Sequence, residues 1–232
     1  MPLFGPSHLT VIALTFLIPL ALAWMVRCVN QPGLTWSVNG SLVIILVAAK
    51  LSALWLAHQR GYLDLQNALP MHLCDWAFFT ALITLIWRFK LAYELTYFWG
   101  LAGTMQALLT PDLDFDWPDP RFMTFFLSHG GIIAVVIYTT AGLRMRPTWD
   151  SVWRAILASQ VYLIVTAGVN LLVDANYGYL CRKPENPSLM DYFGPWPWYI
   201  LTLEVAAIVS YLLYYSPFAL TDYLRRQHQP RP

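Results

Sequence analysis

The amino-acid sequence predicts an all-α fold, a polytopic transmembrane helix bundle of about seven spans, and three observations carry this prediction. The 232 residues are 58% hydrophobic and 12% charged, whereas roughly 25% is usual for a soluble domain. Apolar stretches close to the roughly 20 residues that cross a bilayer recur along the chain. Short polar segments separate these stretches. We therefore expect a single integral membrane domain over residues 1–232.

Seven apolar stretches are candidates for spans, at residues 8–27, 38–58, 69–87, 93–110, 123–143, 152–175 and 196–217. Only the segment 88–90 separates the third from the fourth, so these two are the least clearly divided. Pro70 suits a helix start at the third span, because its missing N–H would have no partner in a first turn. Pro111 marks the end of the fourth span in the same way.

The distribution of Lys and Arg predicts the orientation of the bundle, since these residues stay preferentially on the cytoplasmic side. With the N-terminus outside, the inner side receives nine of them and the outer side four. The inner set is Arg27, Arg88, Lys90, Arg144, Arg146, Arg154, Arg225, Arg226 and Arg231, and the outer set is Arg60, Arg121, Arg182 and Lys183. We therefore expect a multi-pass protein of the cell membrane with a cytoplasmic C-terminus.

The composition also limits the classes of partner. A net charge of +1, with no basic stripe along the chain, gives no electrostatic footprint for nucleic acid. Membrane lipid is the expected partner instead. The sequence indicates no cofactor and leaves the oligomeric state open. Because "MPLFGPSHLT" carries no Lys or Arg, we expect the first apolar stretch to remain as a helix rather than to be cleaved as a signal peptide.

Polar side chains at one depth of the predicted bundle indicate a chamber near the outer leaflet. With a rise of about 1.5 Å per residue, Cys74 would lie roughly 8 Å below the outer end of the third span and His129 roughly 10 Å below that of the fifth. Four further polar residues come to a similar level from other spans: Gln106, Asn170, Asp174 and Glu204. Polar groups inside spans usually face the bundle interior or an aqueous cavity.

The stretch "LPMHLCDWAFF" at 69–79 carries the densest set of reactive side chains. On a regular helix His72 and Asp75 share a face, whereas His72 and Cys74 point in nearly opposite directions. His129, from another helix at equal depth, is therefore the better base for Cys74. The positive end of the helix dipole would favour the thiolate form of Cys74. His72 and Asp75 would then orient each other or the substrate.

Each of these residues also has a purely structural interpretation. Cys74 would pack as a small hydrophobic residue. His129 would bond a backbone carbonyl at a tight helix contact allowed by Gly130 and Gly131. Asp75 and Glu204 would neutralise Lys50, which lies within the second span. Gln106 and Asn170 would hold membrane helices together through hydrogen bonds.

Three weaker signals remain open at this stage. His72, Cys74 and His129 would supply zinc ligands, although their spacing matches no zinc motif, and we predict no metal site. A disulfide between Cys74 and Cys181 would exclude a nucleophile at Cys74. The segment "TPDLDFDWPDP" has carboxylates at 112, 114, 116 and 119 but lacks the Gly and Glu of a calcium loop, so a solvated outer loop is favoured.

Four stretches give the chain a resemblance to a known family: "LPMHLCDWA" at 69–77, "YFWGLAGTMQALLTPD" at 97–112, "FFLSHGG" at 125–131 and "NLLVDANYGYLCRKPENPSLMDYFGPWPWYI" at 170–200. In this order they resemble the YwaF-type family of bacterial integral membrane proteins, whose eukaryotic relatives include a transmembrane acyltransferase of ether phospholipids. The resemblance implies that Cys74 is an acyl-accepting nucleophile and His129 its partner. It also suggests a distant similarity to the androgen-induced membrane hydrolases, which use a Thr and a His in a comparable place.

These observations lead to one main hypothesis and two alternatives. The main hypothesis is a membrane-embedded thiol acyltransferase or lipid hydrolase, with a Cys74–His129 dyad acting on phospholipid or lysophospholipid acyl esters near the outer leaflet. Gln106 or Asn170 would donate to the oxyanion. The first alternative is a transporter or small-molecule-binding protein that uses the same polar chamber. The second is a structural or assembly partner without chemistry.

Overall fold

Every regular element of the protein is a helix in the computed structural model, which describes residues 2–111, 113–184 and 188–227. The helices are α1 (Pro6–Val29), α2 (Pro32–Gln59), α3 (Leu73–Trp87), α4 (Lys90–Trp99), α5 (Met105–Leu109), α6 (Pro120–Ile137), α7 (Trp149–Val173) and α8 (Trp198–Gln227). Two π-helical segments, η1 (Gly100–Thr104) and η2 (Tyr138–Gly142), continue α4 and α6. Two 3₁₀ turns, η3 (Tyr177–Tyr179) and η4 (Leu189–Phe193), lie between α7 and α8.

Five of these helices are long and apolar enough to cross a membrane, which confirms the prediction of a multi-pass helical membrane protein. They are α1, α2, α6 with η2, α7 and α8. The third predicted span is the shorter apolar helix α3, with 15 residues. The fourth is a helical segment made of α4, η1 and α5. Five helices of spanning length are therefore present among the described residues, and the count of seven spans stays a prediction.

The third predicted span begins later than the sequence suggested. Residues 69–72 are not helical, and α3 starts at Leu73, so Pro70 precedes the helix instead of opening it. The reason lies in two contacts that hold this segment outside the helix. The backbone N–H of Leu69 donates to the Tyr177 hydroxyl at 2.9 Å. The backbone N–H of His72 donates to the Asp75 carboxylate at 3.1 Å, which closes the N-terminus of α3.

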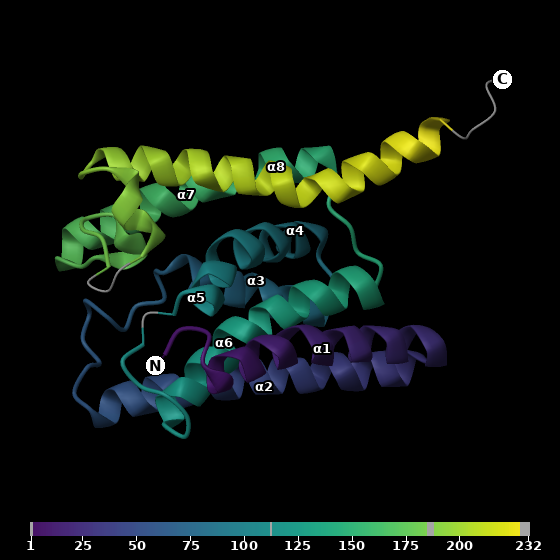
Figure 1. The fold of residues 1–232 in the computed structure, drawn as a ribbon, viewed down its shortest axis with the longest axis horizontal. Coiled ribbons are helices and arrows are strands. Elements are labelled where there is room, and N and C mark those ends of the chain that lie inside the picture. Colours follow the sequence, from purple (N-terminus) through teal and green to yellow (C-terminus); the bar gives the residue numbers. More distant parts are fainter. Residues whose placement is uncertain (1, 112, 185–187, 228–232) are drawn as a thin grey trace.

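The helices form three layers that run along the long axis of the molecule (Figure 1). Helices α1, α2 and α6 pack together on one side, and α7 and α8 form the opposite side. Between them lie α3 and α4, which contact each other closely and also reach α6. The loop after α2, the N-terminus of α6 and the turns between α7 and α8 come together at one end, next to the N-terminus of the chain.

Helix α4 is the most enclosed element of the bundle. Its residues from Ala92 to Trp99 are all buried, and the rings of Tyr93, Phe98 and Trp99 are almost completely covered. By contrast, α1, α2, α7 and α8 expose many large apolar side chains, among them Ile44 and Ile164. This pattern is typical of a bundle whose outer helices face lipid while its centre is packed by protein.

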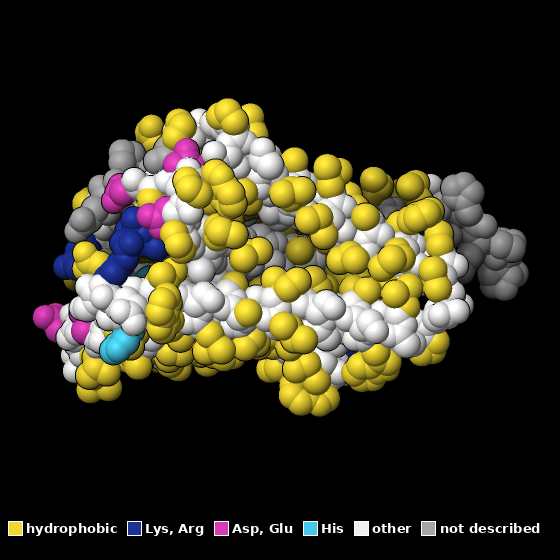
Figure 2. Space-filling view, turned by 90° about the horizontal axis from the view of Figure 1, so that it is seen from below, with side chains coloured by type: hydrophobic (Ala, Val, Ile, Leu, Met, Phe, Trp, Pro, Cys, Tyr) yellow, Lys and Arg dark blue, Asp and Glu magenta, His cyan; other side chains and the backbone are white. Residues whose placement is uncertain are grey.

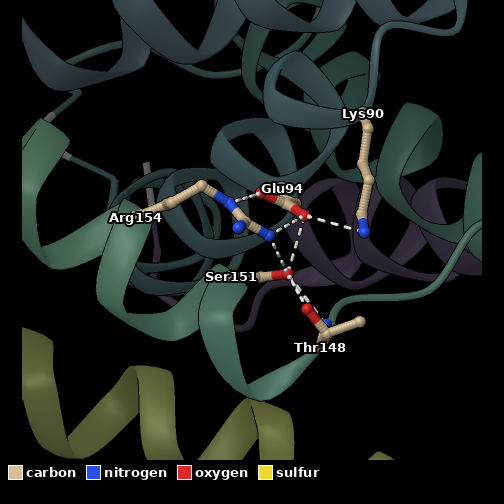
Figure 3. Close-up of polar contacts among 5 residues, drawn as sticks. All are labelled: Lys90, Glu94, Thr148, Ser151 and Arg154. Carbon is tan, nitrogen blue, oxygen red and sulfur yellow. Dashed lines mark hydrogen bonds and ion pairs between the residues drawn. The ribbon is translucent and has the colours of Figure 1, made fainter.

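A buried carboxylate, Glu94, joins α4 to α7 at the opposite end of the bundle from the N-terminus (Figure 3). Arg154 donates from Nε and Nη2 to its two carboxylate oxygens, each at 2.7 Å. The Ser151 hydroxyl donates to Oε1 at 2.7 Å and accepts from the backbone N–H of Thr148 at 2.8 Å. Lys90 lies 4.0 Å from the same oxygen. The sequence analysis did not identify this cluster, because nothing in the local pattern around Glu94 marks its partner.

Glu94 and Arg154 are unequally exposed, so removing one should cost a different free energy of unfolding from removing the other. The side chain of Glu94 is 1% exposed and that of Arg154 is 39% exposed. We expect Arg154→Ala to lower the free energy of unfolding by about 2–3 kcal/mol, because it strands a buried carboxylate. Glu94→Gln should cost about 1 kcal/mol, because water can solvate the freed guanidinium. Thermal unfolding of the purified protein in detergent measures both, and the double variant should be less destabilised than the sum. Equal losses for the two single variants would contradict this account.

Glycines allow the close approach of α6 and η2 to the outer helices. A Cβ on Gly130 would lie 2.7 Å from the Thr15 hydroxyl of α1, and one on Gly131 would lie 2.7 Å from a methyl group of Leu46 of α2. The tight helix contact that the sequence predicted at Gly130 and Gly131 is therefore present. At Gly142 the neighbour is backbone: a Cβ there would lie 3.0 Å from the Cα of Ala23.

Gly142→Ala tests this packing because the backbone of α1 cannot move aside as a side chain can. We expect a loss of about 1–2 kcal/mol in the free energy of unfolding. The control is Gly168→Ala in α7, where an added Cβ would meet nothing within 4 Å. That change should be neutral or raise stability by about 0.5 kcal/mol, since Ala is the better helix former. Thermal unfolding in detergent reports both, and a stable Gly142→Ala protein would show that η2 and α1 are not tightly packed.

Candidate functional site

A cavity of about 920 Å³ opens at the end of the molecule where the loop after α2 meets the turns between α7 and α8. Residues from α2, α3, α5, α6, α7 and α8 line it, so both outer layers and the central layer contribute. Its walls are mostly apolar. Figure 2 shows Lys and Arg side chains gathered in a hollow at this end, while hydrophobic side chains cover much of the remaining face. Apolar walls with a few polar groups are typical of a site for a small molecule or a lipid.

Cys74 is the second residue of α3 and lines this cavity. Its thiol is free and half-buried, and Cys181 is also a free thiol, so the structure contains no Cys74–Cys181 disulfide. The ring of Tyr162 covers this turn: its hydroxyl donates to the carbonyl of Met71 at 3.2 Å, and its ring meets the edge of Trp76 at 5.3 Å. The thiol therefore sits at the positive end of a helix and faces an enclosed space.

An ion pair anchors the first turn of α3 to α2. Asp75 is buried, and its Oδ1 accepts from the ammonium of Lys50. Its Oδ2 accepts from the backbone N–H of His72. The interpretation of Asp75 as the partner of Lys50 is thus confirmed. Glu204 has a different partner, since the side-chain amide of Gln160 donates to it.

His129 lies in α6 and lines the same cavity. Its Nδ1 lies 2.9 Å from the carbonyl oxygen of Phe125, and its ring stacks on the Phe125 ring at 4.2 Å. A carbonyl only accepts hydrogen bonds, so Nδ1 carries the proton in the neutral ring. Nε2 is then an acceptor, and it has no hydrogen-bond partner among the described residues. The sequence alternative was a bond to a carbonyl across a helix contact, but the carbonyl belongs to Phe125, one turn earlier in α6 itself. This bond leaves the other ring nitrogen available as a base.

His72 presents the opposite arrangement. Its Nδ1 accepts from the backbone N–H of Gly178 at 3.4 Å. Its ring packs against Tyr177 and Tyr179, with ring centroids 5.3 and 5.9 Å away. Because an acceptor nitrogen is unprotonated, the proton of the neutral ring is on Nε2. His72 also lines the cavity, so this ring brings a donor to the same space.

Cys74 and His129 share the cavity, but no hydrogen bond joins them in the part of the chain that the structure describes. The space between the walls is open to a ligand. In proteins without a bound substrate, catalytic hydrogen bonds are often long and tighten only when substrate is present. The pairing of these two residues across the bundle therefore stays a prediction: they line one cavity without a hydrogen bond between them among the described residues.

The other predicted site residues separate into two groups. Gln106 and Glu204 line the cavity. Asn170 is buried away from it, where its amide donates to the carbonyl of Tyr177 at 2.9 Å and its amide oxygen accepts the backbone N–H of Tyr177 at 2.8 Å. Asn170 is therefore not a free oxyanion donor, because its donor is already used to hold the turn after α7. Asp174 is exposed at the C-terminus of α7 in a left-handed conformation and does not line the cavity.

Two tyrosines that the sequence analysis missed shape the site. Tyr162 covers the start of α3, as described above. The hydroxyl of Tyr177 donates to the carbonyl of Leu65 at 2.8 Å and accepts from the backbone N–H of Leu69 at 2.9 Å. Neither stands out in the sequence, because lipid-facing and site-facing rings of a membrane protein have the same local pattern. Only the spatial position of the turns distinguishes them.

The acidic segment at the mouth of the cavity acts as a helix cap. Asp119 precedes α6 and accepts from the backbone N–H of Arg121 at 2.8 Å and from its guanidinium at 2.7 Å. These hydrogen bonds lower the pKa of Asp119 to about 2. Asp112, which the sequence analysis placed in the same acidic segment, lies outside the described residues. Within the described ranges, no group of three or more His, Cys, Asp and Glu side chains is placed to hold a metal ion.

The Lys50–Asp75 ion pair should control the stability of the start of α3. The side chain of Lys50 is 30% exposed and that of Asp75 is 9% exposed. We expect Lys50→Met to lower the free energy of unfolding by about 2 kcal/mol, below the value for a fully sealed pair because Lys50 is partly solvated. The matched control is Lys90→Met, because the side chain of Lys90 is 64% exposed and its ammonium lies 4.0 Å from the Glu94 carboxylate. It should cost less than about 0.5 kcal/mol. Thermal unfolding in detergent compares the two, and equal shifts would contradict a special role for Lys50.

A comparison with known protein families gives a match over most of the chain. The model of the TMEM164 family, a family of transmembrane proteins, matches residues 3–215. This range contains every residue that the preceding paragraphs place at the cavity. No curated protein and no solved structure matches the chain.

Proposed function

Because the chain belongs to the TMEM164 family of transmembrane proteins, its cavity lies within a membrane protein that contacts lipid, and we propose that it transfers acyl groups of membrane lipids through Cys74. The substrate is the acyl ester of a phospholipid or lysophospholipid. The acceptor is a second lysophospholipid or water. The observation that carries the proposal is the position of a free thiol at the N-terminus of α3, in the wall of a large apolar cavity that also contains His129.

The proposed reaction begins with Cys74 as a thiol, so a base must take its proton as the sulfur attacks. As the Cys74 sulfur attacks the ester carbonyl, Nε2 of His129 takes the thiol proton. A bond forms between sulfur and the carbonyl carbon, and the electron pair of the carbonyl moves to its oxygen. When this intermediate collapses, the ester C–O bond breaks and the leaving alcohol takes the proton from His129. The products are a thioester on Cys74 and a lysolipid.

The second half of the reaction reverses these steps with another alcohol. The acceptor hydroxyl enters the cavity, His129 removes its proton, and the oxygen attacks the thioester carbonyl. The sulfur leaves and recovers a proton from His129. If a lysolipid is the acceptor, the protein is a transferase, and if water is the acceptor, it is a hydrolase. The apolar walls favour transfer, because a dry cavity limits access of water to the thioester.

The proposed orientation places this cavity on the outer side of the cell membrane. The supporting observation is the distribution of Lys and Arg, which are fewer at the cavity end of the helices than at the opposite end. The cavity end has Arg60, Arg121, Arg182 and Lys183, and the opposite end has Arg27, Arg88, Lys90, Arg144, Arg146, Arg154 and Arg225. Since Lys and Arg are enriched on the cytoplasmic side, the richer end is the inner one. In this orientation the chain crosses the membrane seven times, and α3 and the α4–η1–α5 segment are two of the crossings.

Mass spectrometry of the intact protein tests the acyl-enzyme directly. The purified protein in nanodiscs of phosphatidylcholine should gain the mass of one acyl chain, and neutral hydroxylamine should remove it because the adduct is a thioester. Cys74→Ala should abolish the adduct, and His129→Asn should slow its formation by about 10²-fold or more. His129→Asn is informative because its amide can still donate to the carbonyl of Phe125.

The other two cysteines provide matched controls. Cys28 and Cys181 are exposed free thiols outside the cavity, so Cys28→Ala and Cys181→Ala should acylate at the normal rate. Full acylation of Cys74→Ala would overturn the proposal. Transport of lipid or solute by Cys74→Ala at the normal rate, without any acylation in the unmodified protein, would favour a transporter instead.

A further inference from the structure

We propose that His72 is the oxyanion donor of this site, and this inference rests on the proposed acyl transfer. The starting observation is that two imidazoles line one cavity with opposite tautomers. His129 donates from Nδ1 to the carbonyl of Phe125, so its Nε2 accepts. His72 accepts at Nδ1 from the backbone N–H of Gly178, so its Nε2 donates. One ring therefore offers a hydrogen-bond acceptor and the other a hydrogen-bond donor to the same space.

Both imidazoles line the cavity, and neither has a sealed ring nitrogen without a partner. Among the described residues, the buried side-chain nitrogen and oxygen atoms without a partner are the hydroxyls of Thr104, Ser128, Thr166 and Ser188, and neither imidazole is among them. His72 and His129 are both half-buried. Each Nε2 therefore has no partner in the described part of the protein. It is left to form a hydrogen bond with a ligand or with water in the cavity.

The ring of His72 is held in place, which a group that stabilises a transition state requires. Tyr177 meets it in a T-shaped arrangement and Tyr179 in a tilted one. Its backbone N–H is held by Asp75, whose other oxygen is paired with Lys50. Gly178 has a left-handed φ of 66°, which turns its N–H toward Nδ1 of the ring. The backbone, the ring orientation and the tautomer are therefore each fixed by a different contact.

The position of His72 relative to Cys74 suits a bond to the carbonyl oxygen and not to the sulfur. His72 is the residue that precedes α3, and Cys74 is the second residue of the helix. The two are close along the chain, but His72 already uses its acceptor nitrogen, so it cannot remove a proton from the thiol. It can donate from Nε2 to the oxygen that becomes negative as sulfur attacks. The other candidate donor from the sequence, Asn170, is occupied by Tyr177.

In the reaction, His72 makes no bond to carbon and its proton is not transferred. When the sulfur–carbon bond forms and the carbonyl electron pair moves to oxygen, Nε2–H of His72 donates a hydrogen bond to that oxygen. When the carbonyl re-forms and the leaving alcohol departs with the proton from His129, the bond weakens again. The two histidines thus have separate roles, with proton transfer at His129 and charge stabilisation at His72.

Two substitutions distinguish the roles of the two ring nitrogens of His72. In His72→Asn the side-chain oxygen can still accept the N–H of Gly178, but the Nε2 donor is lost. In His72→Gln the side-chain amide provides a donor near the position of Nε2. We expect His72→Asn to slow acylation of Cys74 by phosphatidylcholine about 10²-fold. His72→Gln should retain more activity, with a loss of less than about 10-fold.

A second measurement distinguishes stabilisation of the oxyanion from a change in the thiol or in the fold. Alkylation of Cys74 by iodoacetamide needs the thiol and its base but forms no oxyanion. His72→Asn should therefore alkylate at the normal rate, whereas His129→Asn should slow both alkylation and acylation. The rates are measured in the same nanodiscs, on a background in which Cys28 and Cys181 are Ala. The full protein is used throughout.

Each outcome supports or overturns the role of His72 as the oxyanion donor. Slower acylation with unchanged alkylation in His72→Asn supports the proposal. Equal slowing of both reactions would show that His72 acts on the thiol or on the helix start, and unchanged acylation would show that it has no role, so either result overturns the proposal. If the unmodified protein forms no adduct on Cys74, the proposed acyl transfer fails and this inference falls with it. If the adduct forms and His72→Asn forms it equally fast, only the role of His72 is lost.

Discussion

The arrangement of the site depends on one buried carboxylate, that of Asp75. One of its oxygens accepts from Lys50 of α2 and the other accepts from the backbone N–H of His72. This single side chain therefore ties α3 to α2 and sets the residue at which α3 begins. Because α3 begins at Leu73, the thiol of Cys74 lies in the first helical turn and the ring of His72 lies just outside it. A charge in this environment is costly unless it is paired, and the pairing is what positions the two reactive side chains.

The rest of the bundle holds the walls of the cavity around this turn. The enclosed helix α4 and its π-helical continuation fill the centre, and the Glu94–Arg154 pair fixes α4 to α7 at the far end. Glycines let α6 approach α1 and α2, which brings His129 into the wall that Cys74 shares. The outer layers α1–α2 and α7–α8 contact lipid with their exposed apolar side chains. In a bilayer such packing replaces the hydrophobic effect as the force that holds helices together, so close contacts matter more than apolar area.

The polar groups of the cavity have distinct partners, and these partners divide their roles. Asn170 is used to hold the turn at Tyr177, and Glu204 pairs with Gln160. His129 and His72 each have one ring nitrogen bound to backbone and one available. This division follows from the rule that a buried polar atom needs a partner. Atoms that the protein itself satisfies are structural, and those left accessible in the cavity are candidates for contact with a ligand.

The sequence by itself determined that this chain is a helical membrane protein, because the length and composition of its apolar stretches allow no other fold in a bilayer. It also identified Cys74, His129, His72 and Asp75 as unusual, because polar side chains are rare within spans. Only the tertiary structure decided where α3 starts, which tautomer each histidine adopts and that Asn170 is occupied. These features depend on contacts with Tyr177, Gly178 and Phe125, and the first two lie about a hundred residues from His72 in the chain. Periodicity in the sequence reports only which face of a helix is apolar, whereas these contacts depend on how separate segments meet.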